Sequence, residues 1–280
     1  MFYNLIAFDL DGTTLDSNRA ISKKNYAALS KAYKMGIKLV PCTGRSIYEL
    51  PKELNKLIDD FGFSVFPGII TDNGAQVYDL SKKELLYSKG ISKKTALALI
   101  AEGRKHLSLT YGSFGIQGAT DNKGLVWESE TAKPYIQEYK EKWDLPLANL
   151  DELIEWNDGI VKVSMNFLYD SECDEFFDQL SRWPDLTLSS AAAKNIEFMS
   201  AGTCKGEALK FISQYTGIPM ERIMAIGDNL NDMEMIQWAG FGVAMGNAIP
   251  ELKEKADWIT AVNDEDGLAL AIEKMLTEKP

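Results

Sequence analysis

The sequence has very little histidine and cysteine. His106 is the only histidine among 280 residues, and the three cysteines Cys42, Cys173 and Cys204 stand far apart without a CxxC pair. This spacing indicates neither a zinc site nor a disulfide framework. A mechanism that needs a histidine base has one candidate, and a metal site with several histidine ligands is excluded. Because unpaired cysteines are typical of a reducing compartment, we expect the protein to be cytoplasmic.

Long apolar runs and an excess of basic residues are also missing. No stretch reaches about 18 consecutive apolar residues, so no membrane-spanning helix is predicted, and no signal peptide is expected at the N-terminus. With 30 lysines and arginines against 41 aspartates and glutamates, the formal net charge is −11. Nucleic acids and anionic membranes bind clustered lysine and arginine, so neither is expected as a partner. An anionic substrate would need local positive charge or a metal ion.

The sequence does have enough apolar material for two domains. Its hydrophobic fraction of 45% and charged fraction of 25% are those of a globular protein. The outer parts of the chain alternate strand and helix signals, which is typical of a parallel sheet covered on both faces. In between, the predicted strands mix apolar and polar residues, as in a sheet with one covered face. We therefore predict an α/β fold with a Rossmann-like parallel-sheet core, residues 1–80 and 195–280, and an inserted α+β domain, residues 83–192.

Local signals in the first part of the chain give two further expectations. Ser46 followed by Glu49 has the pattern of a capping box, which predicts a helix from Ser46 with Leu50, Leu54 and Leu57 on its apolar side. The sequence Asp-Asn-Gly at residues 72–74 predicts a turn between two strands.

Aspartates follow two of the predicted strands. Asp9 and Asp11 end the apolar run that begins at Leu5, and Asp228 and Asp232 follow the strand in RIMAIGD. Open α/β sheets bind ligands at the carboxyl ends of their strands, where these acids would meet. Close carboxylates repel each other without a cation, and Mg²⁺ prefers such oxygen ligands together with a phosphate. The pattern indicates a divalent-cation site, although each pair alone could cap a helix or lie in a solvated turn.

Positive and hydrogen-bonding groups accompany the acids. Thr43 and the backbone N–H of Gly44 come after a strand and before a helix, where amides and the helix dipole favour an anion. Lys205 begins another predicted helix and could bind phosphate as a point charge. Taken singly, Thr43 is most often a helix cap and Lys205 a surface lysine. Their combination with the acids predicts a phosphate site.

In this order and context, the motifs resemble a known family. The sequence is similar to the four ordered motifs of the haloacid dehalogenase-like phosphohydrolases at Asp9–Thr13, Thr43–Arg45, Lys205–Gly206 and Gly227–Asp232. The inserted domain, Asn73–Ala75 and Gly242–Ala248 resemble the Cof-type subfamily, which has a type IIB cap. The resemblance implies a catalytic core of this family with the inserted domain as its cap.

The resemblance also implies a chemical role for the first two acids. Asp9 attacks phosphorus and forms an aspartyl-phosphate, which divides one difficult displacement into two easier steps. Asp11 protonates the leaving alkoxide and then deprotonates the water that hydrolyses the intermediate.

The same resemblance implies how the ligands are held. A Mg²⁺ cofactor is expected on Asp9, the backbone carbonyl of Asp11, and Asp228, with Asn229 or Asp232 either as a further ligand or behind it. The expected phosphate-binding groups are the Leu10 backbone, Thr43, Gly44, Lys205 and Asn231. Arg45 and Asn73 are candidate substrate contacts.

The function implied is magnesium-dependent hydrolysis of small phosphate monoesters, such as sugar phosphates or phosphorylated cofactors. Two alternatives stay open. A phosphomutase or phosphotransferase would use the same intermediate but pass the phosphoryl group to another hydroxyl. A non-catalytic phosphate-binding protein is the other, and the intact nucleophile and acid count against it. The expected partner is a small phosphorylated metabolite, whose identity the sequence leaves open, as it leaves open whether the protein is a monomer or a homo-oligomer.

Overall fold

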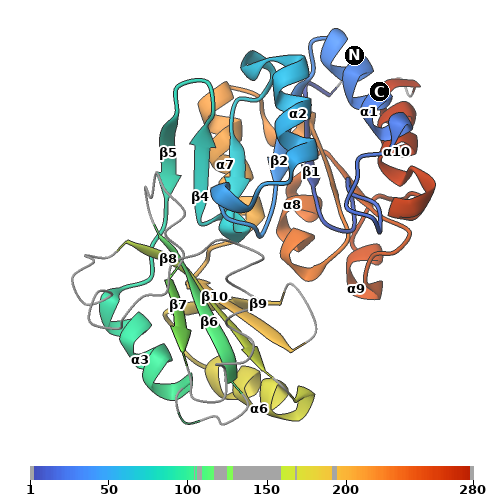
Figure 1. The fold of residues 1–280 in the computed structure, drawn as a ribbon. Helices are drawn as coiled ribbons and strands as arrows, with labels where there is room; N and C mark the ends of the chain where they lie inside the picture. The colour runs from blue at the N-terminus through green and yellow to red at the C-terminus, as the bar shows by residue number, and fades with distance from the viewer. Residues whose placement is uncertain are drawn as a thin grey trace. The chain divides into compact units, whose positions relative to one another are not determined.

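The chain divides into two compact units. The computed structural model describes residues 3–103, 105, 109–116, 125–128, 159–167, 169–190 and 194–277. One unit consists of Met1–Tyr87 with Cys204–Pro280, and the other of Ser88–Thr203. Both are mixed α/β structures (Figure 1), and the parallel-dominated sheet of the first confirms the predicted fold class.

The first unit is built on a sheet that has eight strands in the described residues, in the order β13-β12-β11-β1-β2-β3-β4-β5. All pairs from β13 to β3 are parallel, and β3 pairs with β4 antiparallel. The strands are β1 (Leu5–Asp9), β2 (Lys38–Cys42), β3 (Ile69–Thr71), β4 (Gln76–Asp79), β5 (Glu84–Ser88), β11 (Ile223–Gly227), β12 (Phe241–Ala244) and β13 (Trp258–Ile259).

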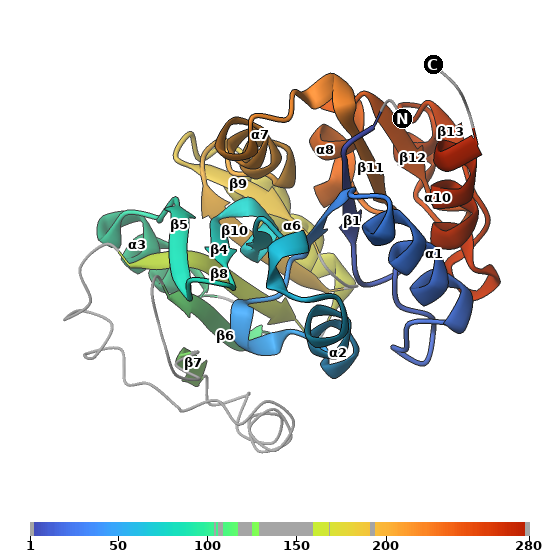
Figure 2. The same cartoon turned by 90° about the horizontal axis from the view of Figure 1, so that it is seen from above.

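The central strand β1 owes its place to an uninterrupted apolar run. Leu5, Ile6, Ala7 and Phe8 are each 0% exposed, as expected where helices cover both faces of a parallel sheet. Helices α7 and α8 lie on one face, and α1 and α10 lie side by side on the other (Figure 2). The helices of this unit are α1 (Lys23–Lys34), α2 (Lys52–Phe61), α7 (Lys205–Thr216), α8 (Met233–Trp238), α9 (Pro250–Lys253) and α10 (Gly267–Thr277).

The helix predicted from Ser46 begins later than expected. The capping box is present, because the Glu49 carboxylate accepts the Ser46 N–H at 3.0 Å. It starts only a short 3-10 turn, Ile47–Glu49, and Leu50 is extended with ψ 134°. Pro51 follows Leu50, and a residue before proline is driven away from the helical region. Helix α2 therefore begins at Lys52.

The second unit has a five-stranded sheet in its described part, in the order β7-β6-β8-β10-β9, with antiparallel pairs throughout. Its strands are β6 (Leu109–Ile116), β7 (Leu125–Glu128), β8 (Ile160–Phe167), β9 (Leu186–Ser189) and β10 (Asn195–Ser200), and its helices are α3 (Lys93–Gly103) and α6 (Asp170–Leu180). Val163 and Phe198 contribute to an apolar core, whereas Lys162 and Glu197 on the other side of the sheet form a buried ion pair at 3.0 Å. Both sides of β8 are thus buried.

The boundaries between the two units differ from the predicted ones because of two strands. Strand β5 extends the sheet of the first unit, and β10 pairs with β8 and β9 in the second. The units therefore meet at Tyr87–Ser88 and Thr203–Cys204, later in the chain at both junctions than residues 80–83 and 192–195. The sequence predicts β10 in the first unit because strand signals are local. The strands with which β10 pairs cannot be recognised from such local signals.

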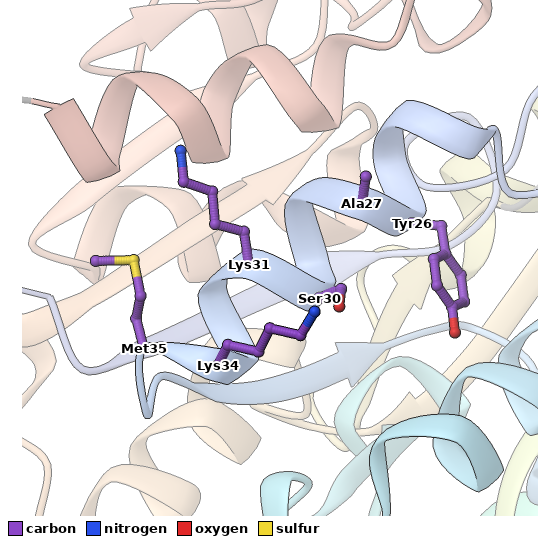
Figure 3. A pocket seen from close by; sticks show the side chains of 6 residues that line it. All are labelled: Tyr26, Ala27, Ser30, Lys31, Lys34 and Met35. Atoms are coloured by element: carbon purple, nitrogen blue, oxygen red, sulfur yellow. The ribbon is translucent and has the colours of Figure 1, made fainter.

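A shallow hollow lies beside α1 (Figure 3), lined by Tyr26, Ala27, Ser30, Lys31, Lys34 and Met35. Helix α1 leads into β2, so the end of the hollow that Met35 lines lies near the amino ends of the parallel strands. The acids that follow β1 and β11 lie at the opposite edge of the sheet.

Among the helices that the structure describes, none is both long and apolar enough to span a membrane.

Candidate active site

The carboxyl ends of three neighbouring strands bring the predicted residues together. Asp9 is the last residue of β1 and pairs in register with Cys42, the last residue of β2, which precedes Thr43. Strand β11 lies on the other side of β1 and ends at Gly227, just before Asp228. Segments that are more than 190 residues apart in the sequence therefore meet at one edge of the sheet.

Three of the predicted acids form a close cluster. Asp9, Asp228 and Asp232 each offer an oxygen atom within 4.8 Å of the other two, and no other such group of acids, cysteines or histidines occurs in the described residues. Asp9 and Asp232 are 5% and 0% exposed. Oxygen donors at this spacing fit a hard divalent cation, which would offset their mutual repulsion.

Burial and mutual repulsion change the titration of this cluster. Burial raises the pKa of Asp9 well above its usual range, and the charges of Asp232 and Asp228 add to the rise while Lys205 opposes it. Burial, followed by the charge of Asp232, raises the pKa of Asp228 to about 6. Both shifts favour the protonated forms of these two acids. A bound cation would favour the ionised forms.

Lys205 is fully buried between two of the acids. Its Nζ donates to Asp9 Oδ1 and to Asp232 Oδ1, both at 2.6 Å, and its side chain is 0% exposed. Burial alone would lower the pKa of Lys205, but the charges of Asp232 and Asp9 outweigh it and raise the pKa, so the ammonium stays protonated. The first residue of α7 is therefore an internal cation of the site.

Asp232 also organises the loop that follows β11. Its Oδ2 accepts the backbone N–H groups of Asp228 at 2.9 Å and Asn229 at 3.1 Å. The Asn229 side chain accepts the N–H of Leu230 at 2.8 Å. Asp232 thus shapes the loop through one oxygen and binds Lys205 through the other.

Asp11 lies outside the acid cluster and binds Arg45. Arg45 Nε donates to Asp11 Oδ2 at 2.7 Å and Nη2 to Oδ1 at 2.6 Å, a two-pronged pairing. A third donor, Nη1, binds the Glu49 carbonyl at 3.1 Å. The Asp11 side chain is 51% exposed, so the expected acid is reachable from solvent, and the Arg45 guanidinium holds it.

The predicted phosphate-binding residues line the same edge. Thr43 is 1% exposed, and its hydroxyl accepts the N–H of Arg45 at 3.1 Å. Leu10 is buried, and its carbonyl accepts the N–H of Thr14 at 3.0 Å. Asn231 donates to Asn73 Oδ1 at 2.9 Å. Asn73 is itself 1% exposed, so its side chain is out of reach of solvent.

The structure adds residues that sequence reasoning did not single out. Thr13 donates through its hydroxyl to Asp228 Oδ1 at 2.8 Å. Asn247 donates to the Gly12 carbonyl at 2.8 Å and accepts the Asn263 N–H at 2.9 Å. Both residues belong to motifs that carry the family resemblance, so their place in those motifs was the available signal. His106, the single histidine, lies outside the described residues.

Comparison with known proteins identifies the class. The family model of the haloacid dehalogenase-like hydrolases matches residues 6–272. The chain is 30% identical to Phosphatase YwpJ of Bacillus subtilis (strain 168), over 97% of this chain and 99% of that protein. It is 32% identical to the 5-amino-6-(5-phospho-D-ribitylamino)uracil phosphatase YcsE of the same organism, over 96% of this chain and 94% of that protein. The structure of a HAD subclass IIB sugar phosphatase shares the fold with a TM-score of 0.81, at 24% identity, over 97% of this chain and 98% of the other.

The chain therefore belongs to the haloacid dehalogenase-like hydrolases. Within them it is a Cof-type phosphohydrolase, an enzyme that acts on phosphate monoesters. Hydrolases of this family generally use a divalent metal ion, and the cluster of Asp9, Asp228 and Asp232 offers suitable oxygen ligands.

Proposed function

We propose that the protein is a magnesium-dependent phosphatase that hydrolyses small phosphate monoesters through an aspartyl-phosphate on Asp9. The observation that carries the proposal is the buried Lys205, which binds both Asp9 and Asp232 at 2.6 Å beside Asp228 in one cluster. The arrangement combines a carboxylate nucleophile, an internal cation and oxygen ligands for a metal at one edge of the sheet.

The carboxylates of Asp9 and Asp228 and the backbone carbonyl of Asp11 would hold the Mg²⁺ ion. When bound, the ion supplies positive charge to the phosphoryl oxygens and to the acids. Asp232 holds the residues around the metal in place, because one of its oxygens binds Lys205 and the other binds the amides of Asp228 and Asn229. Asn229 belongs to the same loop after β11, and its side chain accepts the Leu230 N–H there.

Two proton transfers and two displacements make up the reaction. The Asp9 carboxylate attacks phosphorus, the bond to the ester oxygen breaks, and Asp11 gives its proton to the leaving alkoxide. Asp11 then takes a proton from water, and the water oxygen attacks phosphorus, which releases phosphate and restores Asp9. For this work Asp11 has to turn away from Arg45, its partner in this structure. Arg45 is then free to contact the substrate.

The transferred phosphoryl group is held by donors from four segments. The N–H groups of Leu10 and Gly44, the Thr43 hydroxyl, the Lys205 ammonium and the Asn231 amide provide them. In such reactions positioning and electrostatics supply most of the acceleration, because charge spreads over the phosphoryl oxygens. In this proposal the second unit, Ser88–Thr203, is the cap domain of the enzyme. The substrate is a small phosphorylated metabolite, such as a sugar phosphate or a phosphorylated cofactor.

The compartment belongs to the same proposal. All three cysteines are free, with Cys42 and Cys173 buried. Burial raises the pKa of the Cys173 and Cys204 thiols, which lowers their reactivity at neutral pH. These properties support a reducing, cytoplasmic location.

Asp9→Asn tests the nucleophile, since asparagine keeps the shape of the side chain and removes its charge. Release of inorganic phosphate from a panel of phosphate monoesters is measured with Mg²⁺ and with EDTA. We expect the wild type to release phosphate only with Mg²⁺ and without any acceptor alcohol, and Asp9→Asn to lose turnover while it still unfolds cooperatively. Near wild-type turnover by Asp9→Asn refutes the nucleophile. Phosphoryl transfer only when an acceptor is present would identify a phosphotransferase or mutase, and phosphate binding without turnover would identify a binding protein.

A further inference from the structure

The turn between β3 and β4 has three consecutive residues in the left-handed backbone region. Asp72, Asn73 and Gly74 have φ angles of 50°, 55° and 94°, and Asp72 and Asn73 are each 1% exposed. Left-handed backbone is uncommon for residues other than glycine and persists only where the surroundings hold it. The neighbours that hold this turn are the segments that carry the candidate phosphate donors.

The turn is bonded along the segment that follows β2. The N–H of Asp72 donates to the Arg45 carbonyl at 3.0 Å, and the N–H of Asn73 donates to the Thr43 carbonyl at 3.1 Å. The approach is so close that a Cβ atom on Gly44 would lie 2.7 Å from Asn73 Oδ1. The backbone of Thr43–Gly44 is thus packed directly against Asn73.

The same turn also touches the start of α7, where Lys205 begins the helix. A Cβ atom on Gly74 would lie 2.2 Å from the Cys204 carbonyl oxygen and 2.9 Å from the Lys205 backbone nitrogen. Real side chains do not approach backbone this closely, so only glycine fits at residue 74. The turn thereby fixes how near the Lys205 backbone lies to the segment after β2.

The third contact is a side-chain hydrogen bond to the loop after β11. Asn231 Nδ2 donates to Asn73 Oδ1 at 2.9 Å. A carboxamide nitrogen carries two hydrogens in the plane of the amide. Because one hydrogen is directed at Asn73, the direction of the other is fixed, and that second N–H is available to a phosphoryl oxygen.

We propose that Asn73 is a positioning residue: its side chain orients the Asn231 amide toward the phosphoryl group, while the backbone of its turn contacts the Thr43 segment and the start of α7. This inference rests on the proposed function and assigns Asn73 an indirect role in place of substrate contact. It acts through Asn231, so its effect should depend on that residue. A turn with only a structural role would lower stability without that dependence.

Asn73→Gly is the variant of choice, because glycine adopts the left-handed backbone freely and only the side chain is lost. The variants Asn73→Gly, Asn231→Ala and their combination form a double-mutant cycle. Asn25→Ala is the matched control, since Asn25 is equally buried and its side chain binds two backbone groups, the Thr14 carbonyl and the Ala269 N–H. The readouts are kcat, KM, the affinity for inorganic phosphate measured by calorimetry, and Tm.

We expect Asn73→Gly to lower kcat/KM by about 10- to 100-fold, less than or comparable to the loss of one direct donor to the developing charge, and to weaken inorganic phosphate binding. The double variant should be no worse than Asn231→Ala alone, and Asn25→Ala should lower Tm with kcat/KM unchanged. If Asn73→Gly does not fold, Asn73→Ser, whose side chain is too short to reach Asn231, carries the same test.

Two results would overturn the inference. One is a kcat/KM of Asn73→Gly within twofold of the wild type, and the other is a double variant whose loss is the product of the single losses. A wild type that turns over no phosphate monoester would instead refute the proposed function. In that case the affinities for inorganic phosphate still decide the role of Asn73.

Discussion

Replacing Lys205 by methionine removes the only cation that the described structure places between Asp9 and Asp232. Methionine has nearly the same length and fills the same space, so the change is mainly one of charge. Both carboxylates stay buried, at 5% and 0% exposure, and each loses a partner at 2.6 Å. Breaking a buried ion pair by removal of one partner typically costs about 3–5 kcal/mol. In a protein of this size that corresponds to a fall in Tm of about 10 °C.

The assay is thermal unfolding in EDTA, with phosphatase turnover measured alongside in Mg²⁺. The destabilisation should shrink as the pH is lowered, because burial raises the pKa of Asp9 and its protonation removes one of the unpaired charges. Turnover should fall by at least about 100-fold, as for loss of a group that stabilises developing charge. Lys24→Met is the control: Lys24 binds Asp266 at 2.9 Å but is 79% exposed, so Tm and turnover should stay near the wild type. A Lys205→Met protein with an unchanged Tm in EDTA would refute the reasoning.

Two further predictions concern the metal side and the acid of the site. The pKa of Asp228 is raised from 3.8 to about 6, so without metal this residue contributes stability that is complete below pH 3.8 and is lost as the pH rises to about 6, worth about 3 kcal/mol at most. Mg²⁺ should therefore raise Tm more at pH 7 than at pH 5, and Asp228→Asn should remove most of that difference; an equal Mg²⁺ effect on both proteins would contradict the assignment. In the proposed reaction Arg45 contacts the substrate once Asp11 has turned away from it, so we expect Arg45→Ala to lower kcat/KM by about 10- to 100-fold with little change in Tm. Unchanged kcat/KM would show that Arg45 does not contact the substrate.

The sequence could predict where the site lies but not which side chains bind each other. The strand ends that carry Asp9 and Asp228 follow from apolar runs that end in acids, and the parallel sheet places such ends at one edge. The pairing of Asp11 with Arg45 depends on side-chain rotamers and on the turn at Ile47–Glu49, which no local pattern specifies. The buried place of Asn73 depends on contacts with segments that are distant in sequence.

The same distinction explains the errors in the fold. The capping box at Ser46 is predictable because its residues are three apart, whereas α2 begins only at Lys52 because Pro51 keeps Leu50 out of the helical region. The sequence predicts the strand at Asn195–Ser200 in the first unit, but its partners β8 and β9, which only the tertiary structure defines, place it in the second. Local features such as helix caps can be predicted from the sequence, whereas the strand that a given strand pairs with cannot.

The charges of the site explain why metal and substrate binding should be linked. When ionised, Asp9, Asp228 and Asp232 carry three negative charges, and Lys205 supplies one positive charge in the same cluster. A phosphate monoester dianion would approach a pocket with a net charge of two negative, and in a partly dry site that repulsion is strong. A divalent cation brings the cluster to neutrality, after which Lys205 and the amide donors can attract the phosphate. The acids that would repel the substrate are thus the same groups that, by binding the metal, make the pocket able to accept it.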